Sequence, residues 1–64
     1  MKLDDIVEMG YTKTTERYAD YEIWAKNNSR VLFSPSNGRV VVEYNVNSQN
    51  GKEFHDLYVT EQNN

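Results

Sequence analysis

Alternation of apolar and polar positions is clearest between residues 30 and 46, where two runs flank a short turn. The runs Arg30–Phe33 and Arg39–Val46 are rich in the branched and aromatic residues that favour strands. Between them, Ser34–Gly38 contains proline, serine, asparagine and glycine, which favour a reversal of the chain. The Asn37-Gly38 pair suits the positive φ angles of a tight turn. This pattern predicts a β-hairpin.

The first ten residues have the spacing of a short helix. Leu3, Ile6 and Val7 stand at i, i+3 and i+4, and Gly10 suits the end of such a helix. A helix of two turns is not stable alone in water, so we expect this apolar face to pack on a sheet.

The remaining segments predict further strands. Apolar and polar residues alternate along Tyr18–Lys26, and the Asn27-Asn28 pair then predicts a turn. The polar segment Thr12–Arg17 is either an edge strand or an extended lead-in. Asn50-Gly51 repeats the turn signal, and the run Lys52–Thr60 predicts a closing strand.

These elements predict an α+β fold, in which a short N-terminal helix packs on an antiparallel β-meander of four strands, or five if 12–17 is counted. Residues 1–60 form one domain in this prediction, and 61–64 form a frayed polar tail.

In a meander covered by one helix, a single sheet face is core and the other is polar. The inward set by this reasoning comprises Tyr21, Ile23, Val31, Phe33, Val40, Val42, Tyr44 and Val46. The opposite parity places Trp24, Leu32 and Val41 outward on successive strands, with Arg30 and Glu43 among their polar neighbours. An exposed apolar row of this kind marks an interaction surface. These five residues are the candidate interaction surface.

Two other interpretations of that row remain open. The row is covered if 12–17 or the C-terminal tail folds over it, and a bulge or a one-residue error in register exchanges the two faces. Trp24 is then a core anchor instead of a binding residue, and the tyrosines are packing residues with hydrated hydroxyl groups.

Length and composition favour association with a partner. A chain of 64 residues buries only about 60% of its unfolded surface, so domains of this size usually need a disulfide, a metal or a partner subunit. This chain has no cysteine and one histidine. We therefore expect a protein partner or self-association as a homodimer.

The residues offer little chemistry for catalysis. His55 and Asp56 are the one histidine–carboxylate neighbour pair, but neighbours on a strand point to opposite faces, so no dyad is expected. One histidine without cysteine does not make a transition-metal site, and no glycine-rich phosphate loop is present. We expect no enzymatic activity, no cofactor and no metal.

Charge and hydropathy narrow the partners further. A net charge of −3 with interleaved signs argues against a duplex-DNA footprint, and no apolar run is long enough to span a membrane. Without cysteines or a secretory signal, the chain is expected to be cytoplasmic.

The alternative function is binding of single-stranded nucleic acid. Trp24 beside Lys26 and Arg30, with Arg39 and Tyr44 on a neighbouring strand, has the composition of a stacking platform flanked by cations. Glu22 and Glu43 on the same face would repel phosphate.

The segment Leu3–Lys13 is a short acidic helix that ends in Gly-Tyr, and hairpins rich in tyrosine and asparagine follow it. In this arrangement the chain resembles the small uncharacterised proteins encoded by phages and prophages of Gram-positive bacteria. The resemblance implies an accessory factor that binds a host or phage protein, and it transfers no functional residue. The leading hypothesis is therefore a non-enzymatic protein-binding module that uses the sheet face around Trp24.

Overall fold

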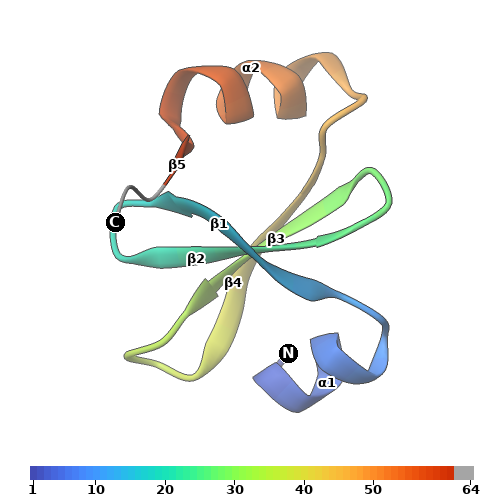
Figure 1. Cartoon of the computed structure of the whole chain (residues 1–64), viewed down its shortest axis with the longest axis vertical. Coiled ribbons are helices and arrows are strands. Elements are labelled where there is room, and N and C mark those ends of the chain that lie inside the picture. The colour runs from blue at the N-terminus through green and yellow to red at the C-terminus, as the bar shows by residue number, and fades with distance from the viewer. Residues whose placement is uncertain (62–64) are drawn as a thin grey trace.

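The computed structural model describes residues 1–61, which form an antiparallel sheet with a helix packed on each face (Figure 1). In chain order the elements are α1 (Leu3–Glu8), β1 (Thr12–Tyr18), β2 (Tyr21–Lys26), β3 (Ser29–Ser34), β4 (Arg39–Asn45), α2 (Gln49–Tyr58) and β5 (Thr60–Glu61). The order across the five-stranded sheet is β4-β3-β2-β1-β5. The predicted α+β class and the meander of β1 to β4 are confirmed, and α2 is an addition to them.

Tight turns join β2 to β3 and β3 to β4 as the sequence predicts, but the predicted strand Tyr18–Lys26 is wrong at its start, where a turn at Ala19 and Asp20 joins β1 to β2. Lys26 pairs with Ser29 across the Asn27-Asn28 loop, and Asn27 has a φ of 53°. Ser34 pairs with Arg39 across the next loop, where Gly38 has a φ of 72°. Asparagine and glycine tolerate this left-handed region better than other residues do, which explains their positions.

Helix α1 begins and ends as predicted but anchors itself differently. The Lys2 N–H donates to Asp5 Oδ2 at 2.9 Å, and Gly10 follows the helix with a φ of 100°. Ile6 is fully buried, whereas Leu3 and Val7 are exposed. One side chain, not the three expected, therefore docks this helix on the sheet.

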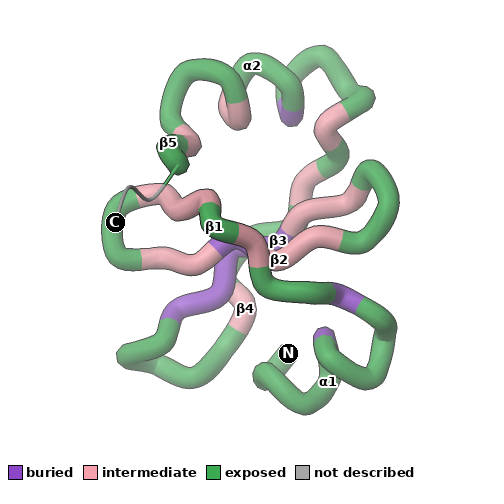
Figure 2. Tube along the Cα trace, in the orientation of Figure 1, coloured by how far each residue is buried: buried purple, intermediate pink, exposed green. Residues whose placement is uncertain are grey.

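The core lies on both faces of the sheet, and the expectation of a one-faced core is wrong. Ile6, Tyr11, Val31 and Phe33 form a buried cluster under α1. Ile23 and Leu32, which pair with each other, are buried on the opposite face. Strand β3 is consequently buried over four consecutive residues, 31–34, visible as the long purple segment in Figure 2.

The predicted closing strand at Lys52–Thr60 is wrong, because most of this segment is helix α2. Ser48 is the N-cap, and its Oγ accepts the N–H of Gly51 at 3.0 Å. Asn50-Gly51, which resembles a hairpin turn in sequence, thus lies inside the first turn of a helix. Phe54, Leu57 and Tyr58 are spaced at i, i+3 and i+4, a helical signal.

Strand β1 resolves the segment whose structure the sequence leaves open. Thr12–Tyr18 is a strand, and β5 pairs on its outer side through Glu16↔Glu61 and Arg17↔Thr60. Glu61 therefore belongs to the sheet and not to a frayed tail, while 62–64 lie outside the described residues. Between Lys13 and Arg17 the register shifts, because β2 advances only from Trp24 to Glu22 over the same stretch.

Candidate binding cleft between β4 and α2

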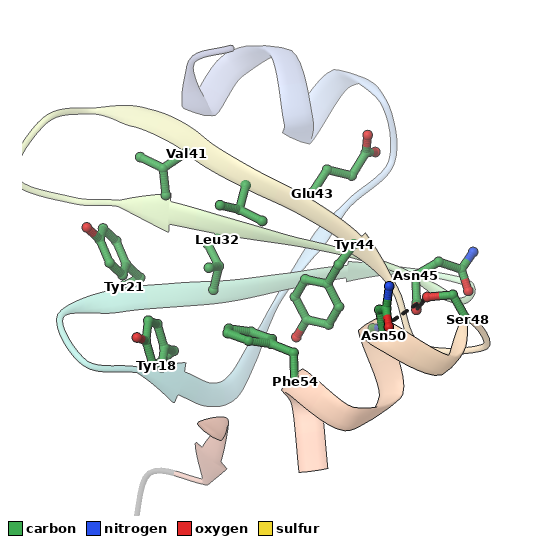
Figure 3. Close-up of a pocket in the computed structure, with 12 residues that line it drawn as sticks. Tyr18, Tyr21, Leu32, Val41, Glu43, Tyr44, Asn45, Ser48, Asn50 and Phe54 are labelled. Carbon is green, nitrogen blue, oxygen red and sulfur yellow. Dashed lines mark hydrogen bonds between the residues drawn. The ribbon is translucent and has the colours of Figure 1, made fainter. Parts of the chain in front are cut away.

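An apolar cleft of about 550 Å³ lies between α2 and the sheet face opposite α1. Strands β1 to β4 form its floor and α2 forms one wall (Figure 3). Its lining comprises Tyr18, Tyr21, Leu32, Val41, Val42, Glu43, Tyr44, Asn45, Ser48, Asn50, Gly51 and Phe54. A volume of this size and a lining of aromatic and aliphatic side chains are typical of binding sites in proteins.

Aromatic rings packed edge to face make the deep wall of the cleft. Phe54 from α2 lies between Tyr44 and Tyr18, with ring centroids 5.1 and 5.3 Å away and interplanar angles of 70° and 65°. Tyr21 stacks on Tyr18 at 6.2 Å. Such contacts fix ring orientation, so this side of the cleft is preformed.

The opposite side of the cleft is aliphatic and open to solvent. Val41 and Val42 on β4 are 42% and 46% exposed. Leu32 beneath them is 3% exposed. Helix α2 covers the aromatic part of this sheet face and leaves Val41 and Val42 of β4 uncovered.

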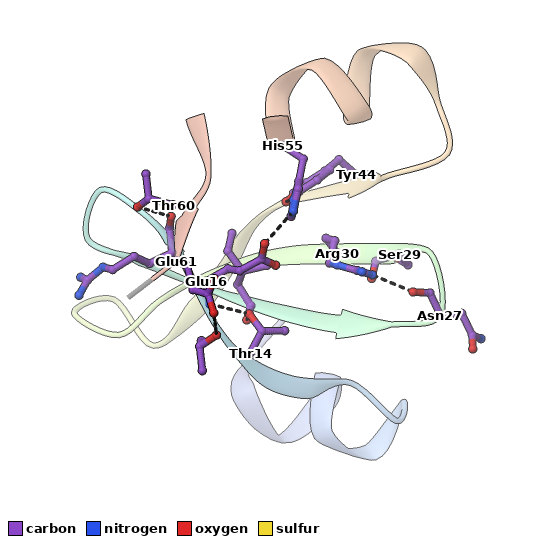
Figure 4. A network of polar contacts seen from close by, with 12 residues as sticks. Thr14, Glu16, Asn27, Ser29, Arg30, Tyr44, His55, Thr60 and Glu61 are labelled. Atoms are coloured by element: carbon purple, nitrogen blue, oxygen red, sulfur yellow. Dashed lines mark hydrogen bonds and ion pairs between the residues drawn. The ribbon is translucent and has the colours of Figure 1, made fainter. Parts of the chain in front are cut away.

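A hydrogen-bonded chain of three side chains ties α2 to the sheet (Figure 4). His55 on α2 bonds Glu16 of β1 through Nε2 at 2.9 Å and Tyr44 of β4 through Nδ1 at 2.8 Å. A carboxylate accepts, so Nε2 donates to Glu16, and in the neutral imidazole Nδ1 then accepts the hydroxyl proton of Tyr44. Both ring nitrogens are thus engaged in joining three elements.

Burial favours this arrangement at Tyr44. Burial and, to a smaller extent, the nearby Glu16 carboxylate raise the pKa of the Tyr44 phenol to about 12, while Arg30 acts in the opposite direction. The phenol therefore stays a neutral donor throughout the physiological range.

The start of α2 is held against β4 by a close approach of backbones. A Cβ added to Gly51 would lie 1.9 Å from the carbonyl oxygen of Asn45, which no real side chain allows. The Ser48 N–H and Oγ both donate to that same carbonyl, at 3.2 and 2.8 Å. Glycine at position 51 is what permits the helix to begin directly beside the strand.

Charge at the cleft is sparse and acidic. Glu43 is the one charged residue among the described residues that line it, and its side chain points away from Phe54 (Figure 3). On the α1 face its carboxylate accepts the hydroxyl of Tyr11 at 3.0 Å and that of Ser29 at 3.4 Å.

The five residues of the candidate interaction surface do not form the predicted row. Trp24 pairs with Val31 and Leu32 pairs with Ile23, so Trp24 and Leu32 lie on opposite faces of the sheet. Trp24 is half-buried beside the α1 cluster. Its ring centroid lies 6.5 Å from that of Phe33, and the two ring planes are at 70°. A two-residue loop sets odd residues of β3 against even residues of β2, which exchanges the parity assumed from the sequence.

The other predicted residues are divided between the two faces. Val41 and Leu32 both line the cleft, and Glu43 contributes to its rim. Arg30 lies on the cleft side of the sheet but bonds the backbone oxygens of Asn27 and Ser29 through Nη1, at 2.7 and 3.0 Å. The nucleic-acid platform is divided as well, because Arg30 pairs with Tyr44 and Ala25 on the face opposite Trp24.

Sequence reasoning missed the contribution of α2 to the site. The sequence pattern assigns Phe54 and His55 to a strand, in which neighbouring side chains point to opposite faces, so the joint packing of both residues against Tyr44 is not predicted. The helical spacing of Phe54, Leu57 and Tyr58 could have revealed the helix, and Ser48 three residues before Gly51 could have marked its start.

Two features are absent from residues 1–61. No helix there is long and apolar enough to cross a membrane. In the same residues, no group of three or more histidine, cysteine, aspartate and glutamate side chains is placed to hold a metal ion.

Known proteins offer no guide to function. No protein-family model matches the chain, and neither the curated proteins nor the solved structures contain a match. The function is therefore inferred from the geometry and chemistry of the cleft.

Proposed function

We propose that this chain is a non-enzymatic protein-binding module that holds its partner in the cleft between β4 and α2. The main support for this proposal is that Val41 and Val42 are about half exposed and lie beside a preformed aromatic wall. An apolar surface left open next to a packed core commonly marks an interaction site. The engagement of both His55 ring nitrogens in structural hydrogen bonds supports a binding role over acid–base chemistry.

Protein binding is also the function predicted from the sequence, but the proposed site is the cleft and not the sheet face around Trp24. Leu32, Val41 and Glu43 belong to the cleft, whereas Trp24 packs under α1 on the other side of the sheet. The accessory role in a phage or prophage, which the resemblance implies, stays a prediction.

A display library of random dodecapeptides, selected on the immobilised chain, tests this proposal. Val42→Lys places a charged side chain at the cleft mouth. The matched control is Val7→Lys on α1, where the valine is 53% exposed and faces away from the cleft. Circular dichroism and thermal melts establish that both variants remain folded.

We expect enriched peptides whose affinity falls at least about tenfold with Val42→Lys and stays unchanged with Val7→Lys, because a buried unpaired charge opposes binding. Selection that enriches no peptide, or peptides that lose affinity equally in both variants, contradicts the proposal.

Binding of single strands, the alternative predicted from the sequence, draws less support from the geometry. No lysine or arginine is among the described cleft residues, although a single-strand groove combines aromatic rings with cations. Titration of Trp24 fluorescence with oligonucleotides at low salt decides this point. A saturable signal that weakens with added salt would favour the alternative.

A further inference from the structure

Strand β4 is an edge of the sheet beside the cleft. Within the described residues the sheet order ends at β4, and five of its seven residues are exposed. The N-terminus pairs with the beginning of the strand only. Lys2 forms an antiparallel bridge with Arg39, and the Val40 N–H donates to the Met1 oxygen at 2.7 Å. An edge of this kind accepts a further strand.

The direction of the backbone groups along β4 follows from its two ends. Val46 donates its N–H inward to the Asn28 oxygen at 2.9 Å. Backbone groups alternate along a strand, so the N–H and C=O of Glu43 and the N–H of Asn45 point away from β3. The outward carbonyl of Asn45 already accepts from Ser48. The free edge therefore centres on Glu43.

Side chains around this position alternate between the two faces. Glu43 points to the α1 face, where Tyr11 and Ser29 hold its carboxylate. Its neighbours Val42 and Tyr44 line the cleft on the opposite face. A strand laid along this edge places the residue opposite Glu43 beside the carboxylate and the two flanking residues over the cleft.

We propose that the partner is an extended segment that pairs antiparallel with β4 and carries an apolar–basic–apolar pattern. Its lysine or arginine lies opposite Glu43, and its two apolar side chains enter the cleft. This inference rests on the proposed function and adds the conformation and charge of the partner.

A second copy of the chain fits this edge less well. Pairing Val41–Asn45 with itself sets Glu43 directly against the same carboxylate of the other copy, and like charges in that position are destabilising. A shift by two residues sets Glu43 against Asn45, whose outward carbonyl Ser48 occupies. Charge and backbone geometry therefore favour a different chain with a basic residue.

The other edge of the sheet, at β1 and β5, is a poorer template for an added strand. There β5 covers Glu16 and Arg17, and the rest of β1 is polar, with an irregular register between Lys13 and Arg17.

Fluorescence anisotropy with three labelled, capped peptides tests the inference on the full chain. The probe has the sequence Gly-Ser-Val-Phe-Lys-Phe-Val-Ser-Gly. One control replaces its lysine with glutamate, and another methylates the backbone nitrogen of that lysine. The protein is used as wild type and as Glu43→Lys, and circular dichroism verifies that the variant folds.

We expect the lysine peptide to bind wild type at least about fivefold more tightly than the glutamate peptide, with the order reversed for Glu43→Lys. The methylated peptide loses about tenfold in affinity, because it cannot donate to the edge. Equal binding of the lysine and glutamate peptides overturns the inference. The inference is also overturned if sedimentation equilibrium shows a dimer of the chain and the peptide dissociates that dimer.

Library-selected peptides that depend on Val42 but lack a basic residue, or that bind as helices, also overturn it. In that outcome the proposed binding function of the cleft survives.

Discussion

Trp24 illustrates how one residue pairing decides the role of a side chain. Its partner across the β2–β3 hairpin is Val31, which places the indole beside Phe33 in the α1 cluster. The indole Nε1 donates to Glu22 Oε1 at 3.2 Å, so its polar atom is satisfied at the surface. Trp24 therefore acts as a half-buried anchor of the core.

We predict that Trp24→Ala lowers the free energy of unfolding by about 2–3 kcal/mol, somewhat less than for a fully buried tryptophan. Val41→Ala, an apolar truncation at an exposed position, changes it by less than about 1 kcal/mol. Urea denaturation followed by far-ultraviolet circular dichroism measures both. Equal effects of the two substitutions would place Trp24 on the surface.

Tyr44 should make stability depend on alkaline pH. Its pKa is near 12 in the folded chain, against 10 for an ordinary tyrosine. The raised pKa means that the folded state keeps a proton which the unfolded state loses above pH 10. The resulting stabilisation is complete below pH 10 and is lost as the pH rises towards 12.

Tyr44→Phe removes this titration, so the difference in urea midpoint between wild type and variant should shrink from pH 9 to pH 11.5. Every other ionisable group is present in both proteins, so its contribution cancels in the comparison. A difference that stays constant over this range would mean that Tyr44 titrates normally.

At the scale of elements, hairpins and α1 could be predicted from the sequence because their signals are local. Gly10, Asn27 and Gly38 adopt the positive φ angles that their residue types favour. Which face of the sheet each strand residue occupies was harder to predict. A one-residue change in the pairing of two strands moves every side chain to the other face. The two-residue Asn27-Asn28 loop sets the strand pairing that places Trp24 and Leu32 on opposite faces of the sheet.

The candidate site was harder to predict than the fold because it depends on α2. A glycine after asparagine is a turn signal in local reasoning, and only the contact of Gly51 with the β4 backbone shows why glycine stands there. The Glu16–His55 contact joins residues far apart in the chain, a tertiary fact that no local pattern contains.

We predict that Gly51→Ala destabilises the chain by about 1–3 kcal/mol, although alanine favours a helix by about 1 kcal/mol over glycine. The new Cβ would overlap the Asn45 carbonyl, so α2 must move away from β4. The control is Asn50→Ala at the exposed neighbouring position. Urea denaturation measures both, and a Gly51→Ala variant as stable as wild type would contradict the close approach.

At the scale of the whole molecule, two small cores replace the single core expected from the sequence. The buried pair Ile23 and Leu32, with the aromatic rings under α2, adds to the cluster under α1. A chain without disulfides thus gains apolar burial on both sheet faces. The need for a partner subunit is correspondingly smaller, and self-association stays a prediction.

Helix α2 contacts the sheet through few side chains. Leu57 and Tyr58 on it are exposed, and Phe54 and His55 provide its inward contacts. An element with few buried apolar contacts opens at lower free energy than the rest of a domain.

The location of a bound peptide shows whether a partner strand pairs with β4 beside the cleft. Uniformly ¹⁵N-labelled chain is titrated with the lysine peptide, and amide chemical-shift changes are mapped residue by residue. If the peptide pairs with β4 over the cleft, the largest changes occur along Val42–Asn45 and at Phe54, and they are lost in Val42→Lys. Largest changes along Thr12–Thr15 or around Trp24 and α1 would contradict pairing with β4.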